Sequence, residues 1–181
     1  MEKAEDLLIH QLKDKKTSQE AFRKLVSQYK ERLYWHIRNM VKDHDDSHDV
    51  LQNTFIKIFR NIGQFKGDSK LFSWMYRIAT NESITFLNKK AKLQQISSDE
   101  LQDAIINNLE SDVYFEGTAI QLKLQKAIAS LPKKQQQVFT MKYFEELKYR
   151  EMAEILETSE GALKASYHIA VKKIEEFLKT N

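Results

Sequence analysis

Apolar residues recur with the spacing of α-helices along most of the chain. A row spaced i, i+4, i+7 and i+11 gives the clearest case, because these positions share one face of a helix. The row is Leu51, Phe55, Ile58 and Ile62. Similar spacing predicts helices over residues 4–14, 22–41, 49–62, 70–92, 149–156 and 160–178, with one more before Pro132 and one after it. With only four glycines and one proline, the chain is predicted to be all-α.

A glycine-containing break at residues 63–69 separates two of these helices, and the second is rich in aromatic residues. Phe72, Trp74 and Tyr76 cannot all point into one core, because neighbours on a helix surface are three or four residues apart. Rings beside Arg, Lys and Asn can instead form a surface for unstacked bases, at about 1–3 kcal/mol per base. The core interpretation is favoured for Phe65 and Trp74. Both interpretations stay open for Phe72 and Tyr76.

The C-terminal third predicts a helix-turn-helix, whose second helix enters the major groove of DNA. Residues 149–156 form a short helix, 157–159 a turn and 160–178 a longer helix, with the small Ala153 at the crossing. The apolar row of the last helix, expected to be buried, is Leu163, Tyr167, Ala170 and Ile174. The face expected to enter the groove is Gly161, Lys164, Ala165, His168 and Lys172.

The net charge of +3 is unevenly distributed over the 181 residues. Residues 1–92 hold 18 basic and 12 acidic side chains, 93–117 hold six acidic and no basic ones, and 118–181 hold 11 basic and eight acidic. We expect two basic domains, 1–92 and 118–181, joined by an acidic linker, 93–117, with a helical turn around 101–109. This distribution suggests a polyanion contacted at two places. An extended linker reaches about 80 Å, enough for two DNA sites roughly 35–70 Å apart.

The absence of cysteine excludes disulfides and thiolate metal sites and fits a reducing cytoplasm. The N-terminus lacks the apolar core of a signal peptide, and no run of about 18 apolar residues could span a membrane. We therefore expect a soluble, cytoplasmic protein with no membrane insertion.

An acidic segment with two histidines, residues 43–49, is a candidate metal site. Counted from Asp43 as a calcium loop, it has His48 and Thr54 where Gly and Glu are required. His44 and His48 have a zinc-compatible i, i+4 spacing, but no general-base pattern surrounds them. The acidic residues suit a helix N-terminus instead. We expect no metal, no cofactor and no small-molecule substrate. With no Ser/His/Asp set, phosphate-binding glycine loop or Walker-type lysine, we expect no enzyme.

Several motifs in one order resemble the extracytoplasmic-function (ECF) sigma factors of bacterial RNA polymerase. Region two of that family resembles DVLQNTF at residues 49–55, FKGDS at 65–69 and WMYRIATN at 74–81. Region four resembles the segment from LPKKQQQVF at 131–139 through EMAEIL at 151–156 to the last helix. The resemblance implies that residues 1–92 bind core RNA polymerase and the minus-ten promoter element. It implies that residues 118–181 bind the minus-thirty-five element.

The resemblance also assigns individual residues. Those implied for the melted minus-ten element are Phe65, Lys66, Ser69, Phe72, Tyr76, Arg77, Asn81, Lys89 and Lys90. Those implied for the duplex minus-thirty-five element are Arg150, Gly161, Lys164, Ala165, His168 and Lys172. Those implied for core polymerase are Asp46, Asp49, Gln52 and Asn53. Implied partners are core RNA polymerase, promoter DNA and an anti-sigma factor, and the linker would run near the RNA exit path.

The sequence departs from the family pattern at a few positions. Ser47 and His48 stand where Ala and Glu are usual, and Glu157 stands where Gly is common. Ser166 and Ile169 stand where arginines are frequent, so the groove face is less basic than usual. The alternative is a stand-alone helix-turn-helix transcriptional regulator, with residues 1–92 as a dimerisation or ligand domain. Such a regulator would bind duplex DNA tightly without polymerase.

Overall fold

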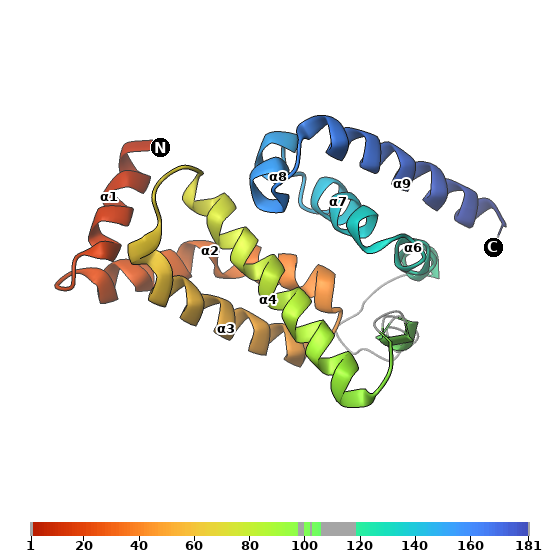
Figure 1. The fold of residues 1–181 in the computed structure, drawn as a ribbon, viewed down its shortest axis with the longest axis horizontal. Helices are drawn as coiled ribbons and strands as arrows, with labels where there is room; N and C mark the ends of the chain where they lie inside the picture. Colours follow the sequence, from red (N-terminus) through yellow and green to blue (C-terminus); the bar gives the residue numbers. More distant parts are fainter. Residues whose placement is uncertain (1, 98–99, 102, 106–118, 181) are drawn as a thin grey trace.

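A computed structural model describes residues 2–97, 100–101, 103–105 and 119–180, and these residues form helices and connecting turns without any strand (Figure 1). The N-terminal half comprises α1 (Glu2–Lys13), α2 (Ser18–Val41), α3 (His44–Asn61), the 3-10 turn η1 (Ile62–Gln64) and α4 (Leu71–Gln94). The C-terminal half comprises α6 (Ala119–Ala129), α7 (Lys133–Tyr143), α8 (Tyr149–Leu156) and α9 (Glu160–Thr180). The all-α prediction is therefore confirmed.

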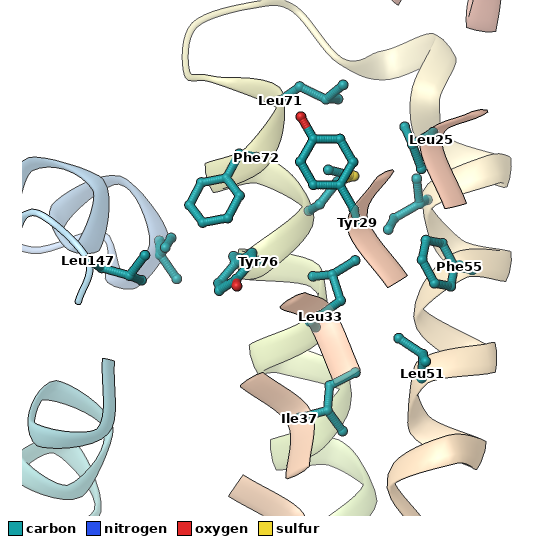
Figure 2. Close-up of a cluster of buried hydrophobic side chains, with 14 of the residues drawn as sticks. Leu25, Tyr29, Leu33, Ile37, Leu51, Phe55, Leu71, Phe72, Tyr76 and Leu147 are labelled. Atoms are coloured by element: carbon teal, nitrogen blue, oxygen red, sulfur yellow. The ribbon is translucent and has the colours of Figure 1, made fainter. Parts of the chain in front are cut away.

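Helices α2, α3 and α4 pack against one another in pairs, and α1 lies against α2 and η1. The apolar row predicted for residues 51–62 faces this core, where Ile58 is fully buried. Figure 2 shows Leu25, Leu33 and Ile37 of α2 lining the same core beside α3 and α4. A helix with one apolar stripe is stabilised when that stripe leaves water, at about 25 cal/mol per Å² of apolar surface.

The turn between α2 and α3 is formed by two residues with opposite roles. Lys42 ends α2 in the left-handed conformation, with φ at +66°, and its N–H donates to the Arg38 carbonyl. Asp43 is the N-cap of α3, and its carboxylate accepts from the Asp46 N–H at 2.9 Å. A cap of this kind is worth about 1 kcal/mol. The expectation that the acidic segment begins a helix is confirmed.

In the C-terminal half, α9 lies across α6, α7 and α8. The Phe139 ring stacks on Tyr143 and Tyr167, with centroids 5.1 Å and 5.8 Å apart. The bounds predicted for the first helix of the helix-turn-helix agree with α8, and the second helix, α9, begins at the predicted residue. In the predicted linker, residues 100, 101 and 103–105 are helical, as expected for a helical turn around 101–109. Residues 102 and 106–109 lie outside the described residues.

The two halves pack together through α4 against α8 and α2 against α7 (Figure 1). One apolar cluster continues across this joint, since it includes Phe72 and Tyr76 from the N-terminal half and Leu147 and Met152 from the C-terminal half. Helix α4 is consequently covered on two sides.

Candidate nucleic-acid interface

The loop between η1 and α4 is anchored at its start and exposed at its tip. The buried Phe65 ring packs on Trp74 with centroids 5.3 Å apart. Lys13 Nζ of α1 donates to the Phe65 carbonyl at 2.7 Å. At the tip, the backbone of Gly67 has a φ of +83°, a value that residues with a Cβ atom rarely adopt. The exposed Lys66 is thus held next to a turn of fixed geometry.

The two aromatic residues left open by the sequence, Phe72 and Tyr76, are buried at 8% and 2% exposure. Their ring centroids are 4.2 Å apart, and the Arg32 guanidinium lies 4.5 Å from the Phe72 ring centroid. The Tyr76 hydroxyl donates to the Arg32 carbonyl at 3.2 Å. Burial raises the pKa of Tyr76, and the nearby Glu145 carboxylate raises it further. Figure 2 shows Leu147 of the other half pointing toward both rings.

The remaining predicted minus-ten residues divide by exposure. Exposed ones are Lys66, Asn81 and Lys89, and partly buried ones are Ser69, Arg77 and Lys90. Arg77 pairs with Glu157 of the C-terminal half, and Lys90 pairs with Asp46 of α3. Trp74, expected in the core, is only partly buried and lies at the edge of the core. Its neighbour on α4, Met75, takes the fully buried position.

The predicted polymerase-docking residues share the first half of α3. Asp49, Gln52 and Asn53 are exposed, whereas Asp46 is partly buried beside Lys90. Of these residues, only Asp46 lies in the first turn of α3, where a carboxylate is stabilised by the helix dipole.

One exposed aromatic near this face was not singled out from the sequence. Trp35 of α2 is 54% exposed and packs edge-on against Tyr34, with centroids 5.4 Å apart. The Tyr34 hydroxyl lies 2.8 Å from His44 Nδ1, at the start of α3. Because adjacent residues on a helix cannot both face the core, the neighbouring aromatics Tyr34 and Trp35 could have indicated from the sequence that one of them is exposed.

The predicted groove face of α9 is exposed throughout, at Gly161, Lys164, Ala165, His168 and Lys172. On the opposite face, Leu163, Ala170 and Ile174 are buried and Tyr167 is partly buried, which confirms the periodicity. Arg150, on α8, is exposed and lies 3.9 Å from Glu154. The Ser159 hydroxyl accepts from the Ala162 N–H at 3.2 Å and caps the start of α9.

Comparison with known proteins decides the family. Residues 25–93 match the model for Sigma-70 region 2, and residues 121–174 match the model for Sigma-70, region 4. The chain is 31% identical over 168 residues to the ECF RNA polymerase sigma factor SigW of Bacillus subtilis. The aligned region covers 85% of this chain and 87% of SigW. The chain belongs to the ECF sigma factors. This sigma factor is also 28% identical over 166 residues to the RNA polymerase sigma-H factor of Pseudomonas aeruginosa, covering 87% and 86% of the two chains.

Solved structures share the fold of this sigma factor. CnrH, in complex with the cytosolic domain of CnrY, superimposes with a TM-score of 0.71 at 19% identity, covering 98% of this chain and 99% of CnrH. The sigma factor RpoE of Bartonella quintana, in complex with the anti-sigma factor NepR, gives 0.65 at 18% identity, covering 88% and 98%.

Two absences hold for the described part of the sigma factor. No group of three or more His, Cys, Asp or Glu side chains there could hold a metal ion. No helix there is long and apolar enough to cross a membrane.

A buried polar network crosses the joint between the halves. His36 of α2 is 1% exposed, and its Nδ1 lies 3.0 Å from both carboxylate oxygens of Glu145, in the loop before α8. Its Nε2 lies 2.8 Å from the Thr80 hydroxyl on α4, which donates to the Tyr76 carbonyl. The sequence signal was a lone histidine among buried apolar positions of α2, but its partner is 109 residues away.

His36 and Glu145 also line a cavity of about 110 Å³, which lies between α2 and α4 on one side and α6 and α7 on the other. Leu101, in the predicted linker, also lines the cavity and is buried. At its rim, Lys42 Nζ donates to Gln125 Oε1 of α6 at 2.8 Å. Burial, and to a lesser extent repulsion from Arg38, lowers the pKa of Lys42 to about 8.

We expect the Lys42→Met substitution to change the pH dependence of stability. Because the pKa of Lys42 falls from 10.5 when exposed to about 8 in the fold, charging Lys42 opposes folding below pH 8. This opposition fades as pH rises from 8 toward 10.5. The stability of the wild type relative to Lys42→Met should therefore rise between pH 7.5 and 9.5, as measured by urea unfolding.

The matched control is Lys30→Met, an exposed lysine on the same helix. Its difference from the wild type should be constant across that pH range. If the stability of Lys42→Met and that of the wild type changed with pH in parallel, the lowered pKa of Lys42 would be contradicted.

Proposed function

We propose that the chain binds core RNA polymerase and directs it to promoters, where it assists DNA melting and the start of transcription. The observation that carries this proposal is the presence of both promoter-binding regions, 25–93 and 121–174, in their family order within one chain. The protein would act as an initiation factor and not as a catalyst. Acting on polymerase would place it in the cytoplasm.

We assign polymerase docking to the face of α3 that carries Asp49, Gln52 and Asn53. All three side chains are exposed while the two halves are packed together, so core enzyme can reach them without rearrangement. The exposed Trp35 of α2 packs against Tyr34, whose hydroxyl contacts His44 at the start of α3. It offers an apolar anchor of the kind that dominates interface energetics.

We assign minus-ten recognition to the loop Phe65–Ser69 and to α4. Asn81 and Lys66 are exposed and suit a base edge and a phosphate, respectively. Phe72 and Tyr76 suit stacking against an unpaired base, which would be captured after unstacking at a few kcal/mol. Both rings are covered by the C-terminal half, so this role requires α4 and α8 to part.

We assign the minus-thirty-five element to α9, whose face with Lys164, Ala165 and His168 is exposed. This face carries small residues and two lysines, Lys164 and Lys172, and can enter a major groove about 12 Å wide without steric obstruction. Few cationic side chains imply modest duplex affinity from this half alone.

An anti-sigma factor is a further proposed partner. RpoE of Bartonella quintana was solved with an anti-sigma factor and CnrH with the cytosolic domain of CnrY. We infer that a comparable protein regulates this chain by covering its promoter- or polymerase-binding surfaces.

The function is tested by run-off transcription from genomic DNA with purified core polymerase, followed by mapping of start sites. A stand-alone regulator would shift duplex DNA in a gel equally well with or without core enzyme. A sigma factor should shift it strongly only with core enzyme, and transcripts should start at a common distance from a shared sequence.

Asn81→Ala should lower run-off transcription about two- to tenfold, as expected for the loss of one hydrogen bond worth about 0.5–1.5 kcal/mol. Core affinity, measured by fluorescence anisotropy, should be retained. The control Thr85→Ala changes another exposed position on α4 and should leave both unchanged. A collapse of core affinity in Asn81→Ala would make Asn81 structural.

The double substitution Asp49→Ala and Gln52→Ala should weaken core affinity about tenfold, because a charged and a polar contact are lost together. Circular dichroism should be unchanged, since both side chains are exposed. Arg60→Ala, at the far end of the same helix, is the matched control. Unaltered core affinity in the double variant would move the docking site elsewhere.

Lys164→Ala should reduce promoter use and flatten the slope of log affinity against log salt by about one, if Lys164 contacts a phosphate. Holoenzyme binding to promoter duplex, titrated with salt, measures this slope. Lys179→Ala removes an exposed lysine from the end of α9 and should leave the slope unchanged. The same slope in both variants would exclude a phosphate contact at Lys164.

A further inference from the structure

Helix α1 lies beside the loop that joins η1 to α4 and contacts this loop at both ends (Figure 1). At the start of the loop, Lys13 Nζ donates to the Phe65 carbonyl at 2.7 Å. At its end, the Leu71 N–H donates to Glu5 Oε1 at 2.8 Å. The partners in these two contacts are 52 and 66 residues apart in the sequence, so helical spacing could not reveal them.

Glu5 supplies what the first turn of α4 does not provide for itself. The N-cap residue of α4, Lys70, makes no side-chain capping hydrogen bond, and the first turn holds no acidic residue. The first N–H groups of a helix have no partner within the helix, and a carboxylate beside them is favoured by the helix dipole. Glu5 meets both needs from another helix, because it accepts from the N–H of the fully buried Leu71.

Apolar contacts hold α1 in the position from which it reaches the loop. Leu12 is 3% exposed, and Leu8 and Ile9 are partly buried against the main core. Glu5 and Lys13 are eight residues apart on this helix, which corresponds to about 12 Å along its axis. Helix α1 therefore sets the separation between the two ends of the loop.

The residues between the two contacts include side chains proposed to meet the minus-ten element. Lys66 is exposed and Ser69 is partly buried, on either side of the positive φ of Gly67. When both ends of a short loop are fixed, the loop has fewer conformations to lose on binding. The two contacts from α1 thus favour a single geometry of the exposed tip.

We propose that Glu5 and Lys13 are positioning residues for promoter recognition, through which α1 holds the loop 65–70 in the geometry that reads the minus-ten element. The proposal rests on the function assigned above, since it assumes that this loop contacts the melted strand. Helix α1 precedes residues 25–93, the segment that matches Sigma-70 region 2. Both side chains act through the backbone of the loop and not by touching DNA.

Limited proteolysis tests the support of the loop without polymerase or DNA. Trypsin cleaves after the exposed Lys66, at a rate that follows how often the loop opens locally. Glu5→Ala should raise this rate about two- to tenfold, the range expected for the loss of one hydrogen bond. Cleavage after Lys16, between α1 and α2, reports detachment of α1 as a whole and should be unchanged. An unchanged rate at Lys66, or an equal rise at both lysines, would overturn the proposal.

Two further variants separate the hydrogen bond from a general effect of substitution in α1. Glu5→Gln keeps an oxygen that can accept from the Leu71 N–H, so trypsin should cleave it after Lys66 at close to the wild-type rate. Asp6→Ala removes a neighbouring exposed carboxylate and should behave as the wild type. Cleavage of Glu5→Gln as fast as that of Glu5→Ala would contradict the role given to this hydrogen bond.

The expected functional effect is a weaker preference for the correct base. Run-off transcription is compared on a promoter with the mapped minus-ten element and on the same promoter with one base of that element changed. Glu5→Ala and Lys13→Ala should each lower the ratio of the two signals about two- to tenfold, because the loop must be ordered on binding. Core affinity should be unchanged, which distinguishes positioning of the loop from a loss of overall structure.

Lys13→Arg keeps a donor for the Phe65 carbonyl and should restore the ratio, whereas Lys16→Ala removes another exposed lysine and should leave it unaltered. A wild-type ratio in both Glu5→Ala and Lys13→Ala would show that α1 does not position the loop for recognition. Absence of transcription from the wild type on any promoter would instead count against the proposed function, while the proteolysis result would stand.

Discussion

The packing of α4 between two apolar surfaces is the constraint on which the rest of the structure depends. One side of α4 contributes Leu71, Met75 and Ala79 to the core with α2 and α3, and the other turns Phe72 and Tyr76 toward Leu147 (Figure 2). A helix that is apolar on two sides needs two covers. Burying a large ring contributes about 1.5–3 kcal/mol, and stacking a base on a ring contributes about 1–3 kcal/mol. Under the proposed function, DNA would therefore replace α8 as the second cover at little net cost, and polymerase docking would decide which of the two covers the rings.

The polar part of the joint sets geometry more than stability. His36 and Thr80 are buried and Glu145 is partly buried, and desolvating such groups offsets much of what their contacts contribute. Their directional bonds nevertheless admit one arrangement of α2, α4 and the loop before α8. If the halves part, as the proposed stacking role of Phe72 and Tyr76 requires, water would replace these bonds and no buried group would be left without a partner. This suits a joint that opens.

Sequence periodicity predicted what depends on neighbouring residues. The buried row of α3, the bounds of α8 and the exposed face of α9 all follow from spacing within one helix. The burial of Phe72 and Tyr76 could not be predicted in this way, because Leu147 lies some 70 residues further along the chain. The same applies to Arg77 and Glu157, which are 80 residues apart. Trp74 was expected in the core because it is large, but α4 offers that position to Met75, and Trp74 covers Phe65 at the edge.

If the proposed DNA-binding surfaces are each weak, a single chain that carries both has an advantage. The groove face of α9 carries Lys164, Lys172 and a histidine, which neutralise few phosphates and give little affinity alone. Phe72 and Tyr76, proposed to bind the minus-ten element, are buried when the halves are packed together, and their rings could stack only on melted DNA. Docking both halves on one polymerase raises the effective concentration of each for its own element, and two weak contacts then act as one strong contact. If neither half binds promoter well by itself, as proposed, promoter occupancy would follow the polymerase.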